Sequence, residues 1–121
     1  MVSRRSIPLC ALALALLVGE DAARGAELAF DIKIEQGRVG EAMRLIRVKQ
    51  GDVVKLRWTT DRPTLLHLHG YDIEKRIAPG TPAELAFTAY ATGRFPIHIH
   101  APGGGQPHDD TPLVTVEVYP R

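Results

Sequence analysis

The sequence predicts an all-β sandwich, and three observations support this fold class. Apolar and polar residues alternate through several short segments, as they do in strands that bury one face. Gly, Pro and Asp residues separate these segments as turns. No stretch keeps a helical period for three turns, although residues 41–47 are compatible with a single helical turn. About seven or eight short strands without internal repeats are typical of such a sandwich.

The alternation places the strands in order along the chain. The first follows Leu28, Phe30, Ile32 and Ile34, and the last follows Val114, Val116 and Val118. We expect Phe30, Trp58 and Phe87 in the core. Pro96 lacks a backbone donor, so it favours an edge position or a bulge for its strand. The expected strands cover residues 28–34, 45–48, 53–60, 65–73, 85–88, 94–100 and 113–119.

The first 25 residues have the pattern of a secretory signal. Two arginines precede an uncharged apolar run at residues 7–19, which is too short to span a bilayer comfortably. Small residues follow, and cleavage after Gly25 would leave a single domain at residues 26–121. The arginine pair partly resembles a twin-arginine signal, although Pro8 departs from that pattern. We interpret Cys10 as part of the discarded signal. The protein is therefore expected to be exported: periplasmic in a Gram-negative source, otherwise extracellular.

The expected mature domain is neutral and has no cysteine. The chain has 15 Lys+Arg and 14 Asp+Glu, and removing Arg4, Arg5, Arg24, Glu20 and Asp21 leaves 12 of each. A neutral domain offers no electrostatic case for binding nucleic acid or an anionic membrane, and no span is expected in the mature chain. Because the single cysteine lies in the signal, disulfides and thiolate chemistry are excluded in the mature domain.

All five histidines lie in the expected domain, and four form two His-x-His pairs. Residues two apart on a strand point to the same face, about 6–7 Å apart at the backbone, so each pair can converge on one ion. A surface role is the alternative for a single pair, but two pairs with one further histidine nearby favour a metal site. Nitrogen-rich sites suit copper(II), zinc or nickel, and copper(II) binds most tightly among them. The candidate ligands are His67, His69, His98, His100 and His108.

Several neighbours of these histidines have two interpretations. Asp72 and Glu74 could orient a histidine through its second ring nitrogen, but turn or surface roles are favoured. Asp109 and Asp110 are better explained as a solvated acidic loop than as oxygen ligands. Tyr71 would share a face with His67 on a continuous strand, where it could either line the site or pack.

Three segments resemble the cupredoxin-like family. They are Ile46-Arg47-Val48-Lys49-Gln50-Gly51-Asp52-Val53-Val54, then Leu65-Leu66-His67-Leu68-His69-Gly70-Tyr71-Asp72, then Thr92-Gly93-Arg94-Phe95-Pro96-Ile97-His98-Ile99-His100. The resemblance covers almost all of residues 30–121 and implies a Greek-key β-sandwich that binds copper. The second segment is similar to those of small exported bacterial members. The His-x-His pairs resemble those that hold copper clusters in multicopper oxidases.

The sequence departs from the blue-copper members of that family in its ligands. Ile99 and His100 stand where a Cys is expected, and no Met follows Met43, so a type 1 copper site cannot form. A histidine-rich copper site for binding, buffering or delivery is the expectation, with another exported copper-handling protein as a partner. Two alternatives stay open. One is a metal-free accessory or interaction domain with the same fold, and the other is a small copper-dependent oxidoreductase.

Overall fold

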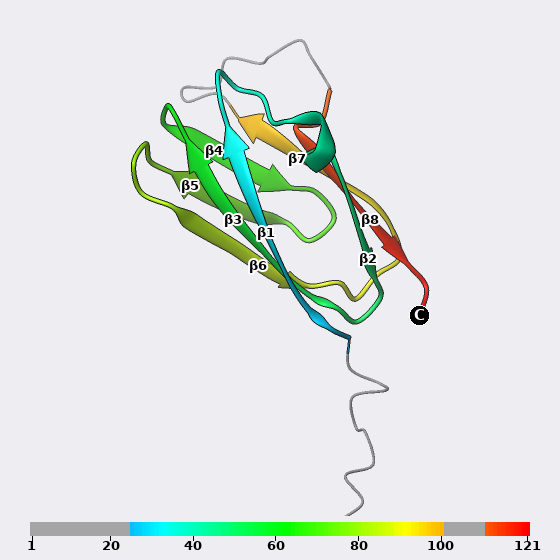
Figure 1. The fold of residues 1–121 in the computed structure, drawn as a ribbon. Coiled ribbons are helices and arrows are strands. Elements are labelled where there is room, and N and C mark those ends of the chain that lie inside the picture. Colours follow the sequence, from blue (N-terminus) through cyan, green and yellow to red (C-terminus); the bar gives the residue numbers. More distant parts are fainter. Residues whose placement is uncertain (1–24, 101–110) are drawn as a thin grey trace, which may run out of the picture.

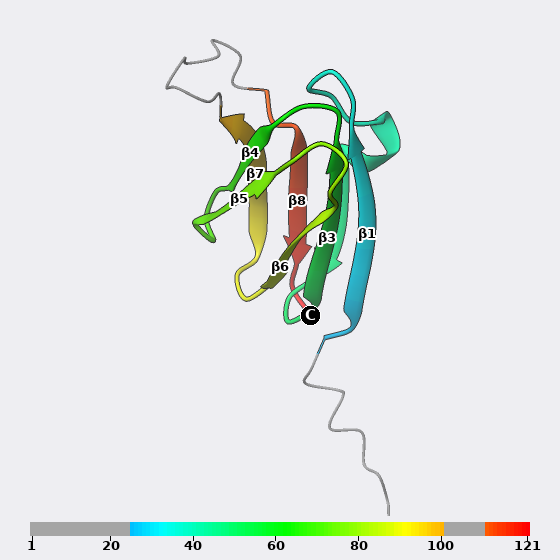
Figure 2. The same cartoon turned by 90° about the vertical axis from the view of Figure 1, so that its left-hand side faces the viewer.

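The computed structural model describes residues 25–100 and 111–121 and confirms the all-β prediction. Within these residues, eight strands form two sheets that face each other as a sandwich (Figures 1 and 2). The one helical element of the described residues is a 3-10 turn, η2 (Glu41–Met43), inside the predicted 41–47 segment. The strands are β1 (Glu27–Ile34), β2 (Leu45–Lys49), β3 (Val53–Thr60), β4 (Thr64–Leu68), β5 (Ile73–Ile77), β6 (Ala83–Thr88), β7 (Gly93–His100) and β8 (Val114–Tyr119).

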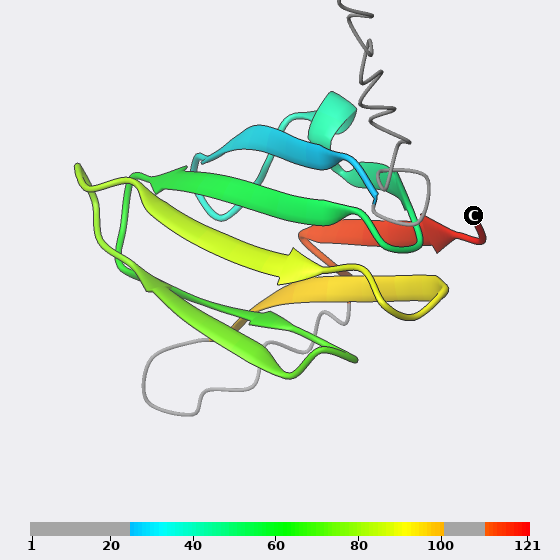
Figure 3. The ribbon, with the colours of Figure 1, turned by 90° about the horizontal axis from the view of Figure 1, so that it is seen from below.

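The strand order is that of a Greek-key sandwich. One sheet has the order β1-β3-β6 and the other β2-β8-β7-β4-β5. The pairs β1 with β3 and β2 with β8 are parallel, and the remaining neighbours are antiparallel. Seen from below, the two sheets lie one above the other (Figure 3). The strands β4 and β7 are therefore central neighbours in the larger sheet.

The core lies between the sheets and fixes which residues face outward. Trp58 on β3 is fully buried, as predicted, and it belongs to one cluster with residues from both sheets. On the larger sheet the fully buried residues include Leu66, Leu68, Ile97, Val114 and Val116. Because side chains alternate along a strand, the residues between them point to the outer face of the five-stranded sheet.

The prediction of one continuous strand over residues 65–73 is wrong. The chain ends β4 at Leu68, turns, and returns as β5, most of which lies beyond the expected strand. Gly70 and Asp72 adopt positive φ angles of 89° and 56° in this turn, which a continuous strand would not allow. The structure thus gives a hairpin where alternation suggested a single strand.

The expected edge position of Pro96 is also wrong, since β7 lies between β8 and β4. The Pro96 carbonyl accepts the His69 backbone N–H at 3.0 Å. In an antiparallel ladder the N–H and C=O of one residue point to the same neighbouring strand. The side of Pro96 that lacks an N–H therefore faces the turn after Leu68. A central proline is tolerated there because β4 has ended and no ladder bond is lost.

A buried carboxylate, that of Asp52 in the turn between β2 and β3, holds several segments together. Asp52 as a whole is only 4% exposed. Its Oδ2 accepts the Lys49 N–H at 2.9 Å, while Oδ1 accepts the Ala26 N–H at 2.9 Å and the Arg121 guanidinium at 2.7 Å. Burial by itself raises the pKa of this carboxyl, but the hydrogen bonds outweigh burial and hold the pKa below 3.8. The ionised form is the one that the fold stabilises.

We predict that Asp52→Asn lowers the free energy of unfolding by about 1–3 kcal/mol at neutral pH, because the amide turns a donor toward three donors. A depressed folded-state pKa stabilises above the unfolded-state value and loses this effect as pH falls, so the deficit should begin to close below about pH 4. Denaturant unfolding at several pH values measures this. Asp61→Asn is the matched control, since Asp61 also accepts a backbone N–H but is exposed. Equal losses in the two variants would contradict the prediction.

Candidate metal centre

The outer face of the five-stranded sheet carries the histidines. His67 lies between the buried Leu66 and Leu68 on β4, so it points away from the core. On β7, His98 and His100 are likewise displaced from the buried Ile97. The β4–β7 register pairs His67 with His98. Adjacent strands therefore bring three predicted ligands to one patch of the surface.

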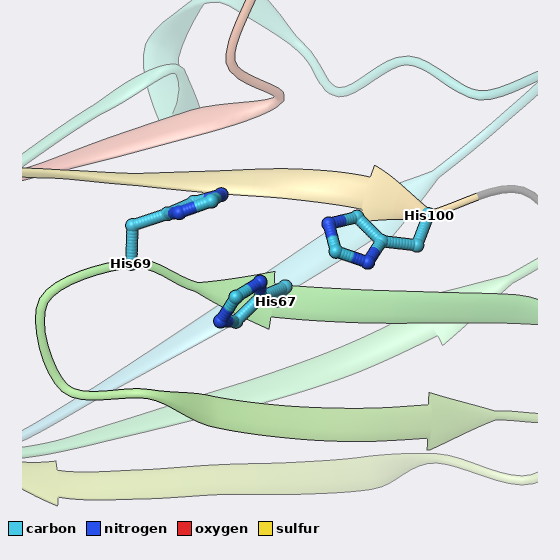
Figure 4. A group of neighbouring side chains, drawn as sticks. All are labelled: His67, His69 and His100. Carbon is cyan, nitrogen blue, oxygen red and sulfur yellow. The ribbon is translucent and has the colours of Figure 1, made fainter. Parts of the chain in front are cut away.

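His69 joins this patch from the turn after β4. Its backbone N–H still bonds to the Pro96 carbonyl of β7, which anchors the start of the turn. The His69 ring lies 4.3 Å from that of His67 and 4.8 Å from that of His98, between centroids. Figure 4 shows the rings of His69, His67 and His100 directed toward a shared space. The expected proximity of His67 and His69 is confirmed, although a turn and not a strand produces it.

Gly70 fixes the path of this turn. A Cβ on Gly70 would lie 2.4 Å from Cδ1 of Phe95, so the backbone rests directly on the aromatic ring. The next residue, Tyr71, packs its ring 4.8 Å from both Phe87 and Phe95. Tyr71 therefore faces the core side, and the idea that it shares a face with His67 is wrong because the strand ends first.

Three of the predicted ligands meet the geometric requirement for a metal site. One ring nitrogen each from His67, His69 and His100 lie within 4.8 Å of one another. The rings of His67 and His100 are 5.0 Å apart, and those of His69 and His100 are 6.3 Å apart, between centroids. His98 lies beside this triad through its contact with His69. His108, and with it Asp109 and Asp110, lie outside the described residues.

The surroundings of His69 favour its neutral imidazole. Burial lowers the pKa of His69, and the neighbouring His67, His98 and His100 lower it further by charge repulsion. A neutral imidazole is the form that binds a metal ion. The neighbours of His69 therefore favour the form of this ring that can bind a metal ion.

Asp72 orients His67. The Asp72 Oδ1 lies 3.3 Å from Nε2 of His67, and a carboxylate oxygen accepts, so this contact favours the tautomer with its proton on Nε2. The lone pair of the neutral ring is then on Nδ1, a buried atom that has no hydrogen-bond partner within the described part of the chain. Sequence analysis favoured a turn or surface role for Asp72. In the positive-φ turn Asp72 has both roles, since it forms part of the turn and also contacts His67. The Gly-x-Asp sequence of residues 70–72 was the signal for this turn.

The residues fit a metal ion with small adjustments. Two nitrogens bound to one ion at about 2.0–2.1 Å can be at most about 4.2 Å apart. The 4.8 Å limit on the triad means that ring rotations of modest size would close the site. The buried Nδ1 of His67, which has no partner among the described residues, is the kind of atom that a cation would satisfy.

Comparisons with known proteins support the fold. No family model matches the chain, and no curated protein matches it in sequence. Among solved structures, a heme-copper terminal oxidase dimer is 16% identical with a TM-score of 0.60, covering 82% of this chain and 67% of that chain. A copper binding protein solved by NMR in the apo form is 10% identical with a TM-score of 0.60, covering 78% and 90%.

The multicopper oxidase mgLAC is similar over a smaller part of its own length. It is 21% identical with a TM-score of 0.61, and the match covers 79% of this chain but 40% of that chain. Identities at this level show a shared fold. The chain thus has the fold of cupredoxin-type copper proteins, and it carries a histidine cluster that could bind a metal.

We predict that Gly70→Ala weakens metal binding at least tenfold and destabilises the fold by about 2–4 kcal/mol. It introduces both an unfavourable positive φ and a clash with Phe95. Gly80→Ala is the matched control, because Gly80 has a similar φ of 80° but nothing within 4 Å of an added Cβ. That control should cost about 1 kcal/mol and leave metal affinity unchanged. Similar metal affinities in the two variants would show that the turn does not position the site.

A second prediction concerns the orientation of His67. Asp72→Ala should lower metal affinity about tenfold, because loss of an outer-shell carboxylate frees the ring and its tautomer. Glu74→Ala is the control, since Glu74 lies opposite His67 on β5. This substitution removes the same charge but not the hydrogen bond between Asp72 and the His67 ring. Calorimetric titration of both variants measures the difference. If Glu74→Ala weakens binding as much, the effect is one of charge and the orienting role is refuted.

Proposed function

We propose that this protein is an exported copper-handling protein that binds Cu(II) through His67, His69 and His100. The observation that supports this best is the convergence of three imidazoles from β4, its turn and β7 on one outer patch of the sheet. An all-nitrogen donor set suits copper(II) above zinc in the series of divalent metals. His98 and His108 are further candidate ligands, His98 because its ring contacts that of His69.

The ligand chemistry supports binding and transfer over blue-copper electron transfer. Residues 26–121 contain no cysteine, so a thiolate-based copper centre is excluded by composition. The cluster lies on the outer face of the sheet, and its histidines are only partly buried. Such a patch lets an incoming ligand reach the ion, as delivery to another exported copper-handling protein requires. When bound, copper would accept electron pairs from the imidazole nitrogens and would provide a redox-active centre.

The place of action is proposed from the leader-like first 25 residues. They support export to the periplasm in a Gram-negative cell, or outside the cell in other sources. In residues 25–100 and 111–121, no helix is both long and apolar enough to cross a bilayer.

Copper(II) titration tests the proposal directly. We expect the chain from Ala26 onward to bind one equivalent tightly, with nitrogen hyperfine structure in electron paramagnetic resonance. His69→Ala/His100→Ala should abolish this binding because two of the three converging nitrogens are removed. Thr115→Val is the control, since Thr115 lies on the same outer face and pairs with Pro96. Weak binding that the histidine substitutions do not change would favour a metal-free interaction domain.

Further measurements refine the ligand set and the class of function. His67→Ala should weaken binding more than His98→Ala, because His67 belongs to the triad and His98 lies beside it. Zinc titration in parallel measures the preference for copper. Turnover of dioxygen with a reductant by the copper-loaded protein, if lost in the double variant, would move the assignment to a small copper oxidoreductase.

A further inference from the structure

The start of the folded domain is fastened to the buried carboxylate of Asp52. Ala26 lies directly before β1, its N–H donates to Asp52 Oδ1 at 2.9 Å, and its carbonyl accepts the Val53 N–H at 2.9 Å. Both polar groups of one backbone residue are therefore held by the β2–β3 turn. This fixes the nitrogen of Ala26 beside the carboxylate of Asp52, a residue that is 4% exposed while Gly25 lies against it.

The residue before Ala26 has no room for a side chain. A Cβ on Gly25 would lie 2.3 Å from the Asp52 nitrogen and 2.4 Å from both its Cα and Oδ1. A chain that continues in this direction must pass against the turn with a glycine. A chain that begins at Ala26 has no such crowding. It also presents a terminal amine in place of an amide at the same position.

We propose that Gly25–Ala26 is a proteolytic processing site whose new α-ammonium forms an ion pair with Asp52. Water supplies the hydrolysis: the C–N bond breaks, hydroxyl joins the Gly25 carbonyl, and the Ala26 nitrogen takes up hydrogen and then a proton. The peptidase would be one that cleaves after small residues, as the sequence Ala23-Arg24-Gly25 fits. The proposal shares the export idea of the proposed function and is independent of the histidines.

The charges around Ala26 set the size of the expected effect. The Asp52 carboxylate already accepts Arg121 on the same Oδ1, so the ammonium gains a buried anion but meets a second cation. Glu27, which pairs with Lys55, is the next residue, and Lys49 contributes its backbone N–H to the other carboxylate oxygen. The net gain is that of a partly buried ion pair, larger than an exposed one and limited by Arg121.

The test compares chains that differ only at the terminus. Within residues 25–100 and 111–121 every strand begins after Gly25, so a chain that starts at Ala26 retains all of these strands. The three chains begin with the free amine of Ala26, with N-acetyl-Ala26, and with N-acetyl-Gly25 followed by Ala26. We expect the free-amine chain to melt roughly 2–6 °C above the other two at pH 6–7.

The pH dependence separates a charge effect from a packing effect. An ion pair raises the folded-state pKa of the amine above its usual value near 7.7–8.0, so its stabilisation is complete below that value and is lost above the folded-state pKa. The melting difference should therefore vanish by about pH 10. It should also disappear when the three termini are placed on Asp52→Asn. Equal melting temperatures at pH 6–7 would overturn the proposal.

Two measurements cover the case in which Asp52→Asn does not fold. Titration of the α-amine in the chain from Ala26, followed by NMR, should give a pKa above about 8. Intact-mass analysis of the full chain, recovered from an exporting cell, should place the first residue at Ala26. A different first residue would refute the proposed processing site, and an amine pKa at or below about 8 would refute the ion pair with Asp52. Neither result would bear on copper binding.

Discussion

Burial of the inner residues of β4 and β7 is the constraint on which the candidate site depends. Leu66, Leu68 and Ile97 must face the core, and strand geometry then sends His67, His98 and His100 to the outer face. A shift of one residue in either strand would move the imidazoles into the core and the apolar side chains into water. The same hydrophobic burial that stabilises the sandwich therefore fixes the direction of the ligands.

The hairpin between β4 and β5 adds the ligand that the strands cannot supply. A continuous strand would carry His69 further along the sheet, but the turn keeps its ring next to that of His67. The turn depends on Gly70, which rests on Phe95, and on Asp72 in a positive-φ conformation. Backbone conformations of this kind are unfavourable for a residue with a side chain and persist where the surroundings determine them. Asp72 combines that conformation with its hydrogen bond to His67.

Alternation was sufficient to predict the fold class, most of the strands and the gathering of the histidines, because burial of one face leaves a period of two in the sequence. It failed between residues 65 and 77, where one strand at 65–73 was expected in place of β4, a turn and β5. The apolar residues Leu68 and Ile73 lie on either side of the turn, so local alternation does not show the reversal. The role of Pro96 was missed for a related reason, since strand order is a tertiary property that decides where a missing donor is tolerated.

The place of the cluster on the sheet has a consequence for metal exchange. In a site enclosed between the sheets, a ligand from outside would reach the ion only after core packing had opened. Here the triad lies above intact packing, with Leu66 and Leu68 fully buried beneath it. Rings on the outer face can rotate toward an ion or away from it without creating a cavity. Filling or emptying the site therefore does not require the core between the sheets to open. That separation suits a protein whose task is to accept and release a metal ion while its fold stays unchanged.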